Sequence, residues 1–514
     1  MTMSISGTDI GGSVYGIIGT GNDGSVTDDL AITISDAVIA GDVCGVGRGL
    51  AEEAMTMSIS GDTRIGGSVY GIGSSDAGNV KGDVDLAISD NALIGGDVYL
   101  SGNINHVGQL TLRMSGGSVA GNIYGSVCDD PIGDTDVIEI VGGAFSAGSA
   151  IFGSGIFANP DTYTQNVSVT LDSAQARLER MVGGVFTAAG DSTTLHGDTE
   201  VTLAAGTVTY GVAGRSVVAG TARAVKDGQA GTRSIVNVSG GYARIVAGGG
   251  MLDREETTAL WTYCYKYIGD TEINVTGGTI DYLFGGNVAR KKLNGAYTEM
   301  HGDTAINIDV SGTNKVRLKY VYAGSNSTSG SQAIQQGNTC VTFTGLGSNL
   351  RWSSTGGVGG DGAGKYADID KSQYERKLVF DDFTGDFGAP EITRFDHLVL
   401  NDSTVVFTGA KLDLGEVAVW EFSLGSSLAL NTGVNSFDGD NLIFGAANQS
   451  ITTDWVAITG YCKTLFGGWD SAHVTVCGGT LTTYDPDTLT WSSAASPYVA
   501  RWDDDSNSII IARA

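Results

Sequence analysis

Residues 55–72 read Met-Thr-Met-Ser-Ile-Ser-Gly-Asp-Thr-Arg-Ile-Gly-Gly-Ser-Val-Tyr-Gly-Ile, and both ends of this stretch occur twice in the chain. Its first part, Met55–Gly61, repeats Met1–Gly7 without a change. Its last part, Gly66–Ile72, repeats Gly11–Ile17 in the same way. A period of about 54 residues that holds two versions of one smaller unit indicates a repeat protein whose units stack on their neighbours.

The smaller unit consists of an alternating apolar run, a glycine turn and a second apolar run that often ends in Val-Tyr-Gly. Alternation such as Met57 and Ile59, or Ile273 and Val275, is typical of a half-buried strand. Equivalent apolar positions of successive units are Ile5, Ile34, Ile59, Ile88, Met114, Ile140, Leu203, Val238, Val275, Ile308 and Phe343. Together these patterns predict an all-β fold, a single right-handed parallel β-helix (β-solenoid) of about 11 or more regular coils.

The rhythm of the repeat changes near Arg376, where short strand-like runs follow one another at closer intervals. We therefore expect residues 1–370 to form the regular coils, with loop insertions around residues 221–300. Residues 371–514 are expected to form a less regular β continuation. The end of this section, from Tyr498 to Ile511, is predicted to form a hairpin that caps the solenoid and protects its open edge.

The charge of the chain excludes some partners. It has 29 Lys and Arg residues against 57 Asp and Glu residues, a formal net charge of -28. Such a surface repels phosphate groups, so we expect no nucleic-acid partner.

No run reaches the roughly 18 to 20 apolar residues of a membrane-spanning helix, so direct membrane insertion of this fragment is not expected. Met1 opens on the repeat itself, without a basic start or a long apolar run; if the protein is exported, we expect its targeting segment to have been removed.

Long loops recur at one corner of consecutive predicted coils, at Thr221–Thr232, at Met251–Ile268 and around residues 290–297. Because coils stack in register, we expect these loops to lie side by side. The basic and aromatic residues expected to bind a ligand are Arg254, Trp261, Tyr263, Tyr265, Arg290 and Tyr297. Aromatic faces stack on sugar rings, and basic groups hold hydroxyls or uronates. The alternative is that these loops are solvated insertions whose aromatic residues cover the coil edge.

Catalysis is a further alternative for the same loops, since carboxylates beside a basic residue can act on a glycosidic bond. If the chain is an enzyme, we expect a polysaccharide lyase or a glycoside hydrolase. Its catalytic carboxylates would come from Asp253, Glu255 and Glu256. Binding is favoured over catalysis, and no Ser/His/Asp or Cys/His grouping can be argued from the sequence.

No cofactor is expected from the sequence, and calcium is the one alternative. The run Gly356–Asp361 resembles a single calcium-binding nonapeptide of the repeats-in-toxin kind, with Asp368 and Asp370 nearby. A weak loop site of Asp361, Asp368 and Asp370 is therefore predicted, although tandem copies are missing and Ala363 replaces a large apolar residue.

The six cysteines have no metal-binding spacing. Cys462 and Cys477 flank one short loop and are candidates for a disulfide. Cys44 occupies the position that Tyr15 and Tyr70 fill in neighbouring units. We therefore expect Cys44 to be a core residue of its coil and not to act as a nucleophile.

The chain resembles the passenger regions of bacterial autotransporters, of the pertactin-like, adhesin-type β-helix class. The likeness is clearest in the Gly-Asp-Thr coils from Gly197 to Gly324, and it continues in Leu398–Ser403 and in the Trp-Asp-Asp-Asp end at Trp502–Asp505. This resemblance implies export to the bacterial cell surface and display outside the cell. The outer-membrane barrel of such proteins is not found in this sequence, which we take as a truncated or processed passenger.

On that resemblance we expect an extracellular structural or adhesive stalk that presents loops to a glycan or to a surface protein of a host or neighbouring cell. The carbohydrate-active enzyme remains one alternative. A second alternative is a subunit of a self-associating surface filament, because an uncapped N-terminal coil could stack end to end on another chain.

Overall fold

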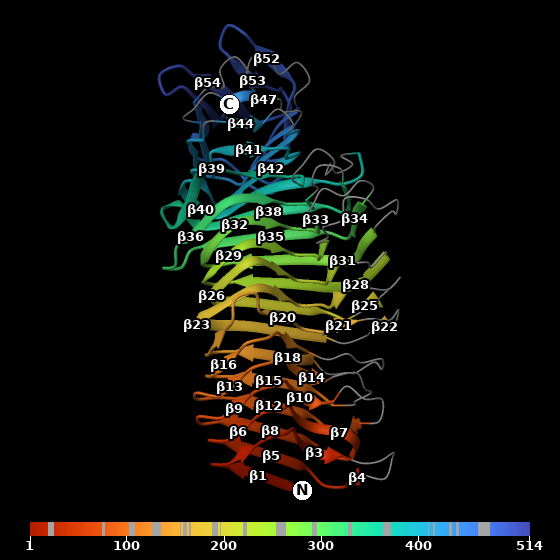
Figure 1. Ribbon diagram of the computed structural model, residues 1–514. Helices are drawn as coiled ribbons and strands as arrows, with labels where there is room; N and C mark the ends of the chain where they lie inside the picture. The colour runs from red at the N-terminus through yellow and green to blue at the C-terminus, as the bar shows by residue number, and fades with distance from the viewer. Residues whose placement is uncertain are drawn as a thin grey trace.

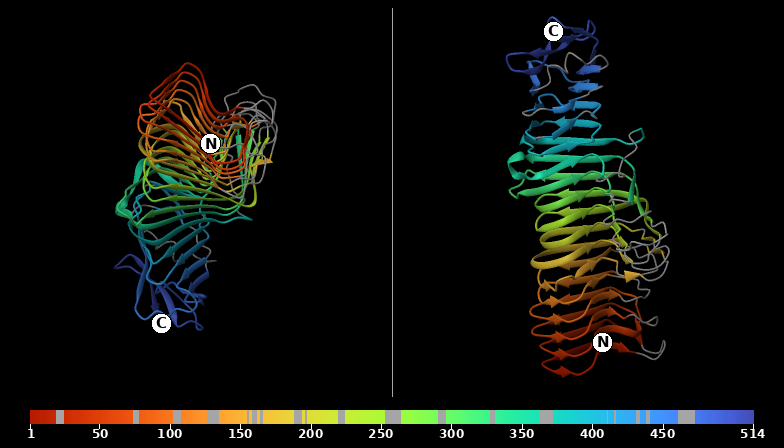
Figure 2. Two further views of the ribbon diagram at one scale, coloured as in Figure 1. Left: turned by 90° about the horizontal axis from the view of Figure 1, so that it is seen from below. Right: turned by 45° about the horizontal axis from the view of Figure 1, so that its top comes forward.

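The computed structural model is one long solenoid of stacked β-strand coils, with the two termini at opposite ends (Figure 1). The coils follow one another along one axis from the N-terminus to the C-terminus (Figure 2). Strands pair in parallel with the equivalent strands of neighbouring coils, which confirms the predicted parallel β-solenoid. The structure describes residues 1–18, 25–73, 78–101, 108–125, 135–154, 156–157, 162–163, 166–187, 194–195, 197–218, 224–252, 264–289, 296–326, 331–362, 372–409, 411–414, 417–430, 434–437, 441–460 and 473–514.

The first ladder of strands carries the apolar column that the repeat predicts. Its strands are β1 (Thr2–Ser6), β5 (Leu30–Ser35), β8 (Met55–Ser60), β12 (Val84–Ile88), β15 (Leu110–Met114), β18 (Thr135–Ile140), β23 (Asn166–Val182), β26 (Thr199–Ala213), β28 (Ala224–Val238), β31 (Cys264–Val275), β35 (Thr304–Val310), β38 (Thr339–Leu346), β40 (Arg376–Asp386), β42 (His397–Asn401), β45 (Val419–Phe422), β48 (Asn441–Phe444) and β50 (His473–Val476). Ile5 pairs with Ile34, and the column continues in register to Phe343. It also contains Leu171, which the sequence alignment of units missed because β23 has no glycine turn.

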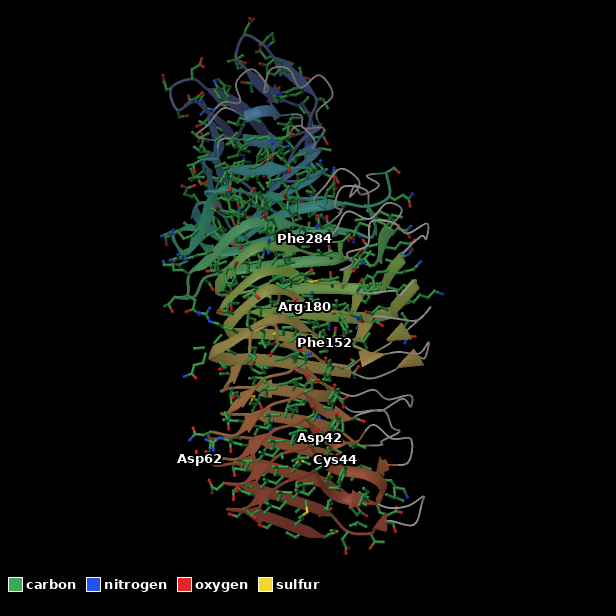
Figure 3. The ribbon with its side chains drawn as sticks, viewed as in Figure 1. Asp42, Cys44, Asp62, Phe152, Arg180 and Phe284 are labelled. Atoms are coloured by element: carbon green, nitrogen blue, oxygen red, sulfur yellow. The ribbon has the colours of Figure 1, made fainter. Side chains whose placement is uncertain are left out.

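A second ladder forms the next side of each coil. Its strands are β3 (Val14–Ile18), β7 (Val43–Ala51), β10 (Val69–Ile72), β14 (Val98–Ser101), β17 (Ile123–Tyr124), β20 (Ala150–Phe152), the later halves of β23 and β26, β29 (Tyr242–Ala247), β32 (Gly278–Phe284), β36 (Val316–Tyr322), β39 (Leu350–Gly359), β41 (Glu391–Thr393), β44 (Lys411–Leu414) and β47 (Val434–Phe437). Val14 and its equivalents face the core, and the residues that follow them face the opposite way. The residues that face away from the core form a second column, which we call the outer column. It contains stacked rings, with 4.9 Å between the ring centroids of Tyr70 and Tyr99 and 4.8 Å between those of Tyr99 and Tyr124. Figure 3 shows Cys44, Phe152 and Phe284 one above another along this side.

Shorter ladders complete the corners. One runs through β2 (Asp9–Ile10), β6 (Val38–Ile39), β9 (Arg64–Ile65), β13 (Leu93–Ile94), β16 (Ser118–Val119) and β19 (Ala144–Phe145). Another runs through β21 (Ile156–Phe157), β24 (Phe186–Thr187), β27 (Val217–Val218), β30 (Met251–Leu252) and β33 (Val288–Ala289). A third runs through β22 (Thr162–Tyr163), β25 (Thr194–Leu195), the first parts of β28 and β31, β34 (Ala296–His301) and β37 (Ser331–Gln336). Two short strands, β4 (Ser25–Val26) and β11 (Gly78–Val80), pair with β7.

Beyond Arg376 the coils become shorter while the core remains continuous. The column of Phe343 passes to Phe380, Leu400 and Phe422. The remaining elements are the 3-10 turn η1 (Gly347–Asn349) and the strands β43 (Thr404–Phe407), β46 (Ser427–Leu430), β49 (Trp455–Gly460), β51 (Gly479–Leu481), β52 (Thr483–Asp485), β53 (Thr490–Ser492), β54 (Tyr498–Asp503) and β55 (Ser508–Arg513). β54 and β55 form the predicted hairpin, and β55 pairs antiparallel with β49. Within the described ranges, no helix is long and apolar enough to cross a membrane.

The Gly-Asp-Thr motif joins neighbouring coils and closes each coil across its interior. Oδ1 of Asp270 accepts a hydrogen bond from the backbone N–H of Asp303 in the next coil, at 2.9 Å. The buried hydroxyl of Thr304 donates to the carbonyl oxygen of Ala323, which directly follows β36 in the same coil, at 2.6 Å. Gly269 precedes this turn with φ of 139°, a conformation that favours glycine. The recurrence of the motif therefore has a structural cause.

Removing the hydroxyl of Thr304 should weaken the fold. We expect Thr304→Val, which keeps the side-chain shape, to lower the free energy of unfolding by about 1–2 kcal/mol, because the buried carbonyl of Ala323 loses its donor. Urea unfolding followed by circular dichroism measures this difference. The control is Thr33→Val on the exposed face of β5, for which we expect little change. Equal losses for the two variants would contradict the role given to the buried hydroxyl.

Cys44 lies in the outer column, in register with Tyr15 on one side and Tyr70 on the other. It is buried, as predicted, although it packs in this outer column and not among the residues of the main core. Burial, with a smaller contribution from the charge of Asp42, raises the pKa of the Cys44 thiol to about 12.

Cys44 should therefore react slowly with alkylating reagents. At pH 8 a pKa of about 12 leaves the thiol almost wholly protonated, and the thiolate is the reactive form. We expect iodoacetamide to modify Cys44 at least ~100-fold more slowly in the native protein than in the urea-unfolded chain. Peptide mass spectrometry over a time course measures both rates, and similar rates would contradict the buried position.

Candidate functional site

The flanks of the predicted ligand-binding loops lie side by side, as expected from the stacking of coils. Ala224 of β28 pairs with Cys264 of β31, which pairs with Tyr297 of β34. Most residues predicted to bind a ligand or to catalyse a reaction in these loops lie outside the described residues. These are Asp253, Arg254, Glu255, Glu256, Trp261, Tyr263 and Arg290. Of Tyr297 the structure describes the strand position alone.

Tyr265 does not lie where we expected it. Its side chain is fully buried, and its hydroxyl donates a hydrogen bond to Oδ2 of Asp227 at 2.8 Å. The prediction that Tyr265 binds a ligand at the surface is therefore corrected, because its ring packs inside the solenoid. Sequence alternation alone does not reveal this. Tyr265 lies in the first part of β31, which runs around the corner of the coil before the strand joins the first ladder.

Tyr265 belongs to a closed polar cluster with Asp227 and Arg215. Nε of Arg215 donates to Oδ1 of Asp227 at 3.0 Å, and the backbone N–H of Ser216 donates to Oδ2 at 3.2 Å. The guanidinium also lies 5.0 Å from the ring centroid of Tyr267. Burial, and then the charge of Asp227, raises the pKa of Tyr265 well above its ordinary value. The groups satisfy one another inside the core, which indicates a structural role.

The predicted calcium site is not supported at Asp361. This carboxylate is buried, and its Oδ1 accepts a hydrogen bond from Nη1 of Arg376 at 3.0 Å, while Nη1 of Arg394 lies 3.8 Å from Oδ2. Two arginines thus take the place of a cation, which corrects the prediction for Asp361. Asp368 and Asp370 lie outside the described residues. In the part of the chain that the structure describes, no group of three or more His, Cys, Asp or Glu side chains is placed to hold a metal ion.

Cys477 has a free thiol in the structure, contrary to the predicted disulfide with Cys462. The thiol is buried and lies close to Gly445, and burial raises its pKa. Cys462 itself lies outside the described residues.

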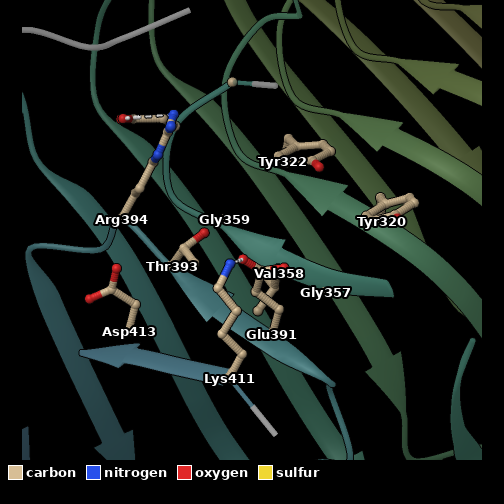
Figure 4. Close-up of a pocket in the computed structure, with 12 residues that line it drawn as sticks. Tyr320, Tyr322, Gly357, Val358, Gly359, Glu391, Thr393, Arg394, Lys411 and Asp413 are labelled. Atoms are coloured by element: carbon tan, nitrogen blue, oxygen red, sulfur yellow. Dashed lines mark hydrogen bonds and ion pairs between the residues drawn. The ribbon is translucent and has the colours of Figure 1, made fainter. Parts of the chain in front are cut away.

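A surface cleft that the sequence did not predict lies on the second ladder, where β36, β39, β41 and β44 meet. Its volume is about 320 Å³, and Tyr320 and Tyr322 form its floor (Figure 4). The two rings lie side by side on β36, with centroids 6.1 Å apart and planes 12° apart. Tyr282 stacks behind Tyr320 at 5.3 Å, and Phe284 stacks behind Tyr322 at 5.5 Å. We call Tyr320 and Tyr322, with these two supporting rings, the tyrosine platform.

The cleft is open because the next coil has glycines where the outer column otherwise has side chains. Gly357 and Gly359 of β39 pair in register with Tyr320 and Tyr322. A Cβ atom added at Gly359 would lie 3.3 Å from Cδ1 of Tyr322 and 3.4 Å from Oγ1 of Thr393. At Gly357 an added Cβ atom would lie 2.6 Å from the carbonyl oxygen of Glu391, so it is the missing side chain of Gly359 that leaves open space beside the ring of Tyr322.

Polar side chains of both signs surround the platform. Lys411 and Glu391 form an ion pair on adjacent strands, and Thr393, Arg394 and Asp413 complete the rim. Figure 4 shows Arg394 and Lys411 on the side of the cleft opposite the two tyrosines. Burial, with smaller contributions from Tyr320 and Glu391, raises the pKa of Tyr322 to about 12, so its hydroxyl remains a donor at neutral pH.

A sequence signal for this cleft exists. The outer positions of Tyr282–Phe284 and Tyr320–Tyr322 are aromatic in two successive coils, and the third coil has Gly357 and Gly359 there. Finding it requires the register of the second ladder, which spacing alone did not give because loops of unequal length separate the coils.

Breaking the ion pair of Arg215 should destabilise the fold strongly. We expect Arg215→Met to cost about 3–5 kcal/mol, because it leaves the Asp227 carboxylate buried without a countercharge. Adding Asp227→Asn should restore much of that loss, since an amide still accepts from Tyr265 and Ser216. Arg233→Met is the control: it removes an exposed pair with Glu272 and should cost less than about 1 kcal/mol. Urea unfolding compares the variants, and equal effects at Arg215 and Arg233 would contradict the buried pair.

Comparisons of this chain with protein-family models, with curated proteins and with solved structures found no match. The cleft is therefore interpreted from its own chemistry: two supported aromatic faces, open on one side and bordered by hydrogen-bonding groups.

Proposed function

We propose that the protein is an extracellular adhesive solenoid that binds a glycan on the tyrosine platform. The observation that carries this proposal is the pair of nearly parallel rings of Tyr320 and Tyr322 in the lining of the cleft, opposite Gly357 and Gly359 of the next coil. Sugar rings present flat C–H faces, which pack on aromatic faces through dispersion and electrostatic attraction. Two rings side by side match two successive sugar units of a chain.

The surroundings of the platform support a polysaccharide over a small apolar ligand. The cleft is an open groove on a solenoid face, and its rim offers a lysine, an arginine, a threonine and two carboxylates for sugar hydroxyls. Hydrogen bonds to such groups give orientation and specificity, while the aromatic floor provides contact area. Glu391 is held by Lys411, which favours binding over acid–base catalysis.

Display at a bacterial cell surface, as the resemblance to autotransporter passengers implies, fits a solenoid with this net charge. A charge of -28 keeps separate molecules apart in solution, and a long stack of coils holds a binding groove at a fixed distance from its ends. The alternatives of a carbohydrate-active enzyme and of a self-associating filament have no comparable supporting observation.

Filling the cleft should weaken glycan binding without removing a polar group. We expect Gly359→Ala to weaken binding about tenfold or more, because the added methyl group occupies the space above Tyr322. Tyr320→Ala and Tyr322→Ala should have similar effects. A glycan array identifies binding sugars, and titration calorimetry on the best of them measures the dissociation constants.

The matched control is Tyr99→Ala, which removes a ring of the same column that is covered on both sides. It should leave glycan affinity unchanged, and circular dichroism checks that every variant is folded. Loss of binding with Trp261→Ala but not with Gly359→Ala would move the site to the 251–268 loop. Turnover of a bound glycan would support the enzyme instead.

A further inference from the structure

A second depression adjoins the tyrosine platform along β36, and its charge differs from that of the molecule as a whole. It has a volume of about 550 Å³, and Arg317, Lys319 and Arg351 contribute three cationic side chains to its lining. Asp281 is the one acidic residue in that lining, and it accepts a hydrogen bond from the hydroxyl of Tyr242 at 2.7 Å. We call this site the basic depression.

The positions of these cations are electrostatically unfavourable without a ligand. Arg317 and Arg351 pair directly in register on neighbouring strands, so two like charges lie opposite each other on one face. Among the described residues, neither of them nor Lys319 forms an ion pair with a carboxylate. In a chain with almost twice as many acidic as basic residues, carboxylate partners are plentiful elsewhere. The arrangement points to a ligand that brings negative charge.

Trp352 also contributes to the lining of the depression. Its Nε1 is buried, and its ring packs against Phe343 and Phe387, so the indole N–H does not face the depression. The depression therefore offers three cations, which suit oxygen acceptors that carry charge.

Lys319 connects the depression to the platform. Its Nζ lies 5.5 Å from the ring centroid of Tyr320 and 5.8 Å from that of Tyr282. One strand thus carries Arg317, Lys319, Tyr320 and Tyr322 in succession. A chain of sugars that stacks on the tyrosines and runs along β36 would therefore reach the cations.

We propose that the glycan is an acidic polysaccharide, whose sugar rings stack on the tyrosine platform and whose carboxylate or sulfate groups bind Arg317, Lys319 and Arg351. This inference rests on the proposed glycan binding and names its ligand class. Arginine presents paired N–H donors that match carboxylate and sulfate oxygens, and such charge-assisted bonds are the strong ones. The depression would then select acidic over neutral glycans.

The test compares two matched pairs of polysaccharides by titration calorimetry. Polygalacturonate is paired with its methyl ester, and a sulfated galactan is paired with the unsulfated galactan. We expect the acidic member of at least one pair to bind at least ~10-fold more tightly than its neutral counterpart, and the advantage to shrink as salt is raised. A preference in the first pair identifies a carboxylate, and one in the second identifies a sulfate ester.

The variant Arg317→Gln/Arg351→Gln should reduce the affinity for the acidic polysaccharide about tenfold and leave that for the neutral one unchanged. Arg64→Gln, which removes an exposed charge on β9, is the control and should change neither. If glycans bind, and Tyr320→Ala abolishes binding, but acidic and neutral forms bind equally, the acidic-ligand inference is overturned while the proposed function stands. If no polysaccharide binds in either pair and the array is also silent, both are overturned.

Discussion

Each coil of this solenoid satisfies its backbone N–H and C=O groups on the coil before it and the coil after it, in parallel register. Because identical positions lie directly above one another, every side chain meets its own equivalents, and the molecule is built of columns. Apolar columns fill the interior, from Ile5 to Phe444. Polar columns form at the turns, where the carboxylates of Asp270 and Asp303 accept hydrogen bonds from backbone N–H groups of the coils that follow them.

The same register explains part of the acidic composition. Oδ1 of Asp42 accepts a hydrogen bond from the backbone N–H of Ser68 at 2.8 Å, and Oδ1 of Asp97 accepts one from that of Asn122 at 2.7 Å. A carboxylate, an amide or a hydroxyl serves this purpose, as Ser13 shows for Asp42. Many of the acidic residues therefore have structural partners, and their frequency carries little information about a ligand.

The interior of the fold could be predicted because it depends on short-range alternation that each unit repeats. The positions of Ile59, Val275 and Phe343 in one column follow from sequence alone, whereas Leu171 was missed because its unit lacks the glycine turn. The candidate site could not be predicted, because it depends on which residues of different coils share an outer column. Tyr322 and Gly359 are far apart in sequence, and loops of unequal length separate successive coils. Sequence spacing alone therefore does not show that these two residues pair. Likewise, burial of Tyr265 and the arginine partners of Asp361 arise from contacts between loops and coils.

The two glycines of β39 have a consequence for how such a molecule changes over evolutionary time. In this architecture a cleft can arise by omission: Gly359 pairs in register with Tyr322, and the absence of its side chain leaves space beside that ring. A single codon can therefore open or close a binding surface without altering a strand, a turn or the length of a coil. The outer column recurs in every coil, so a substitution in another coil can create a recognition surface there. Related solenoids can therefore differ in where they bind a ligand while their core residues stay the same.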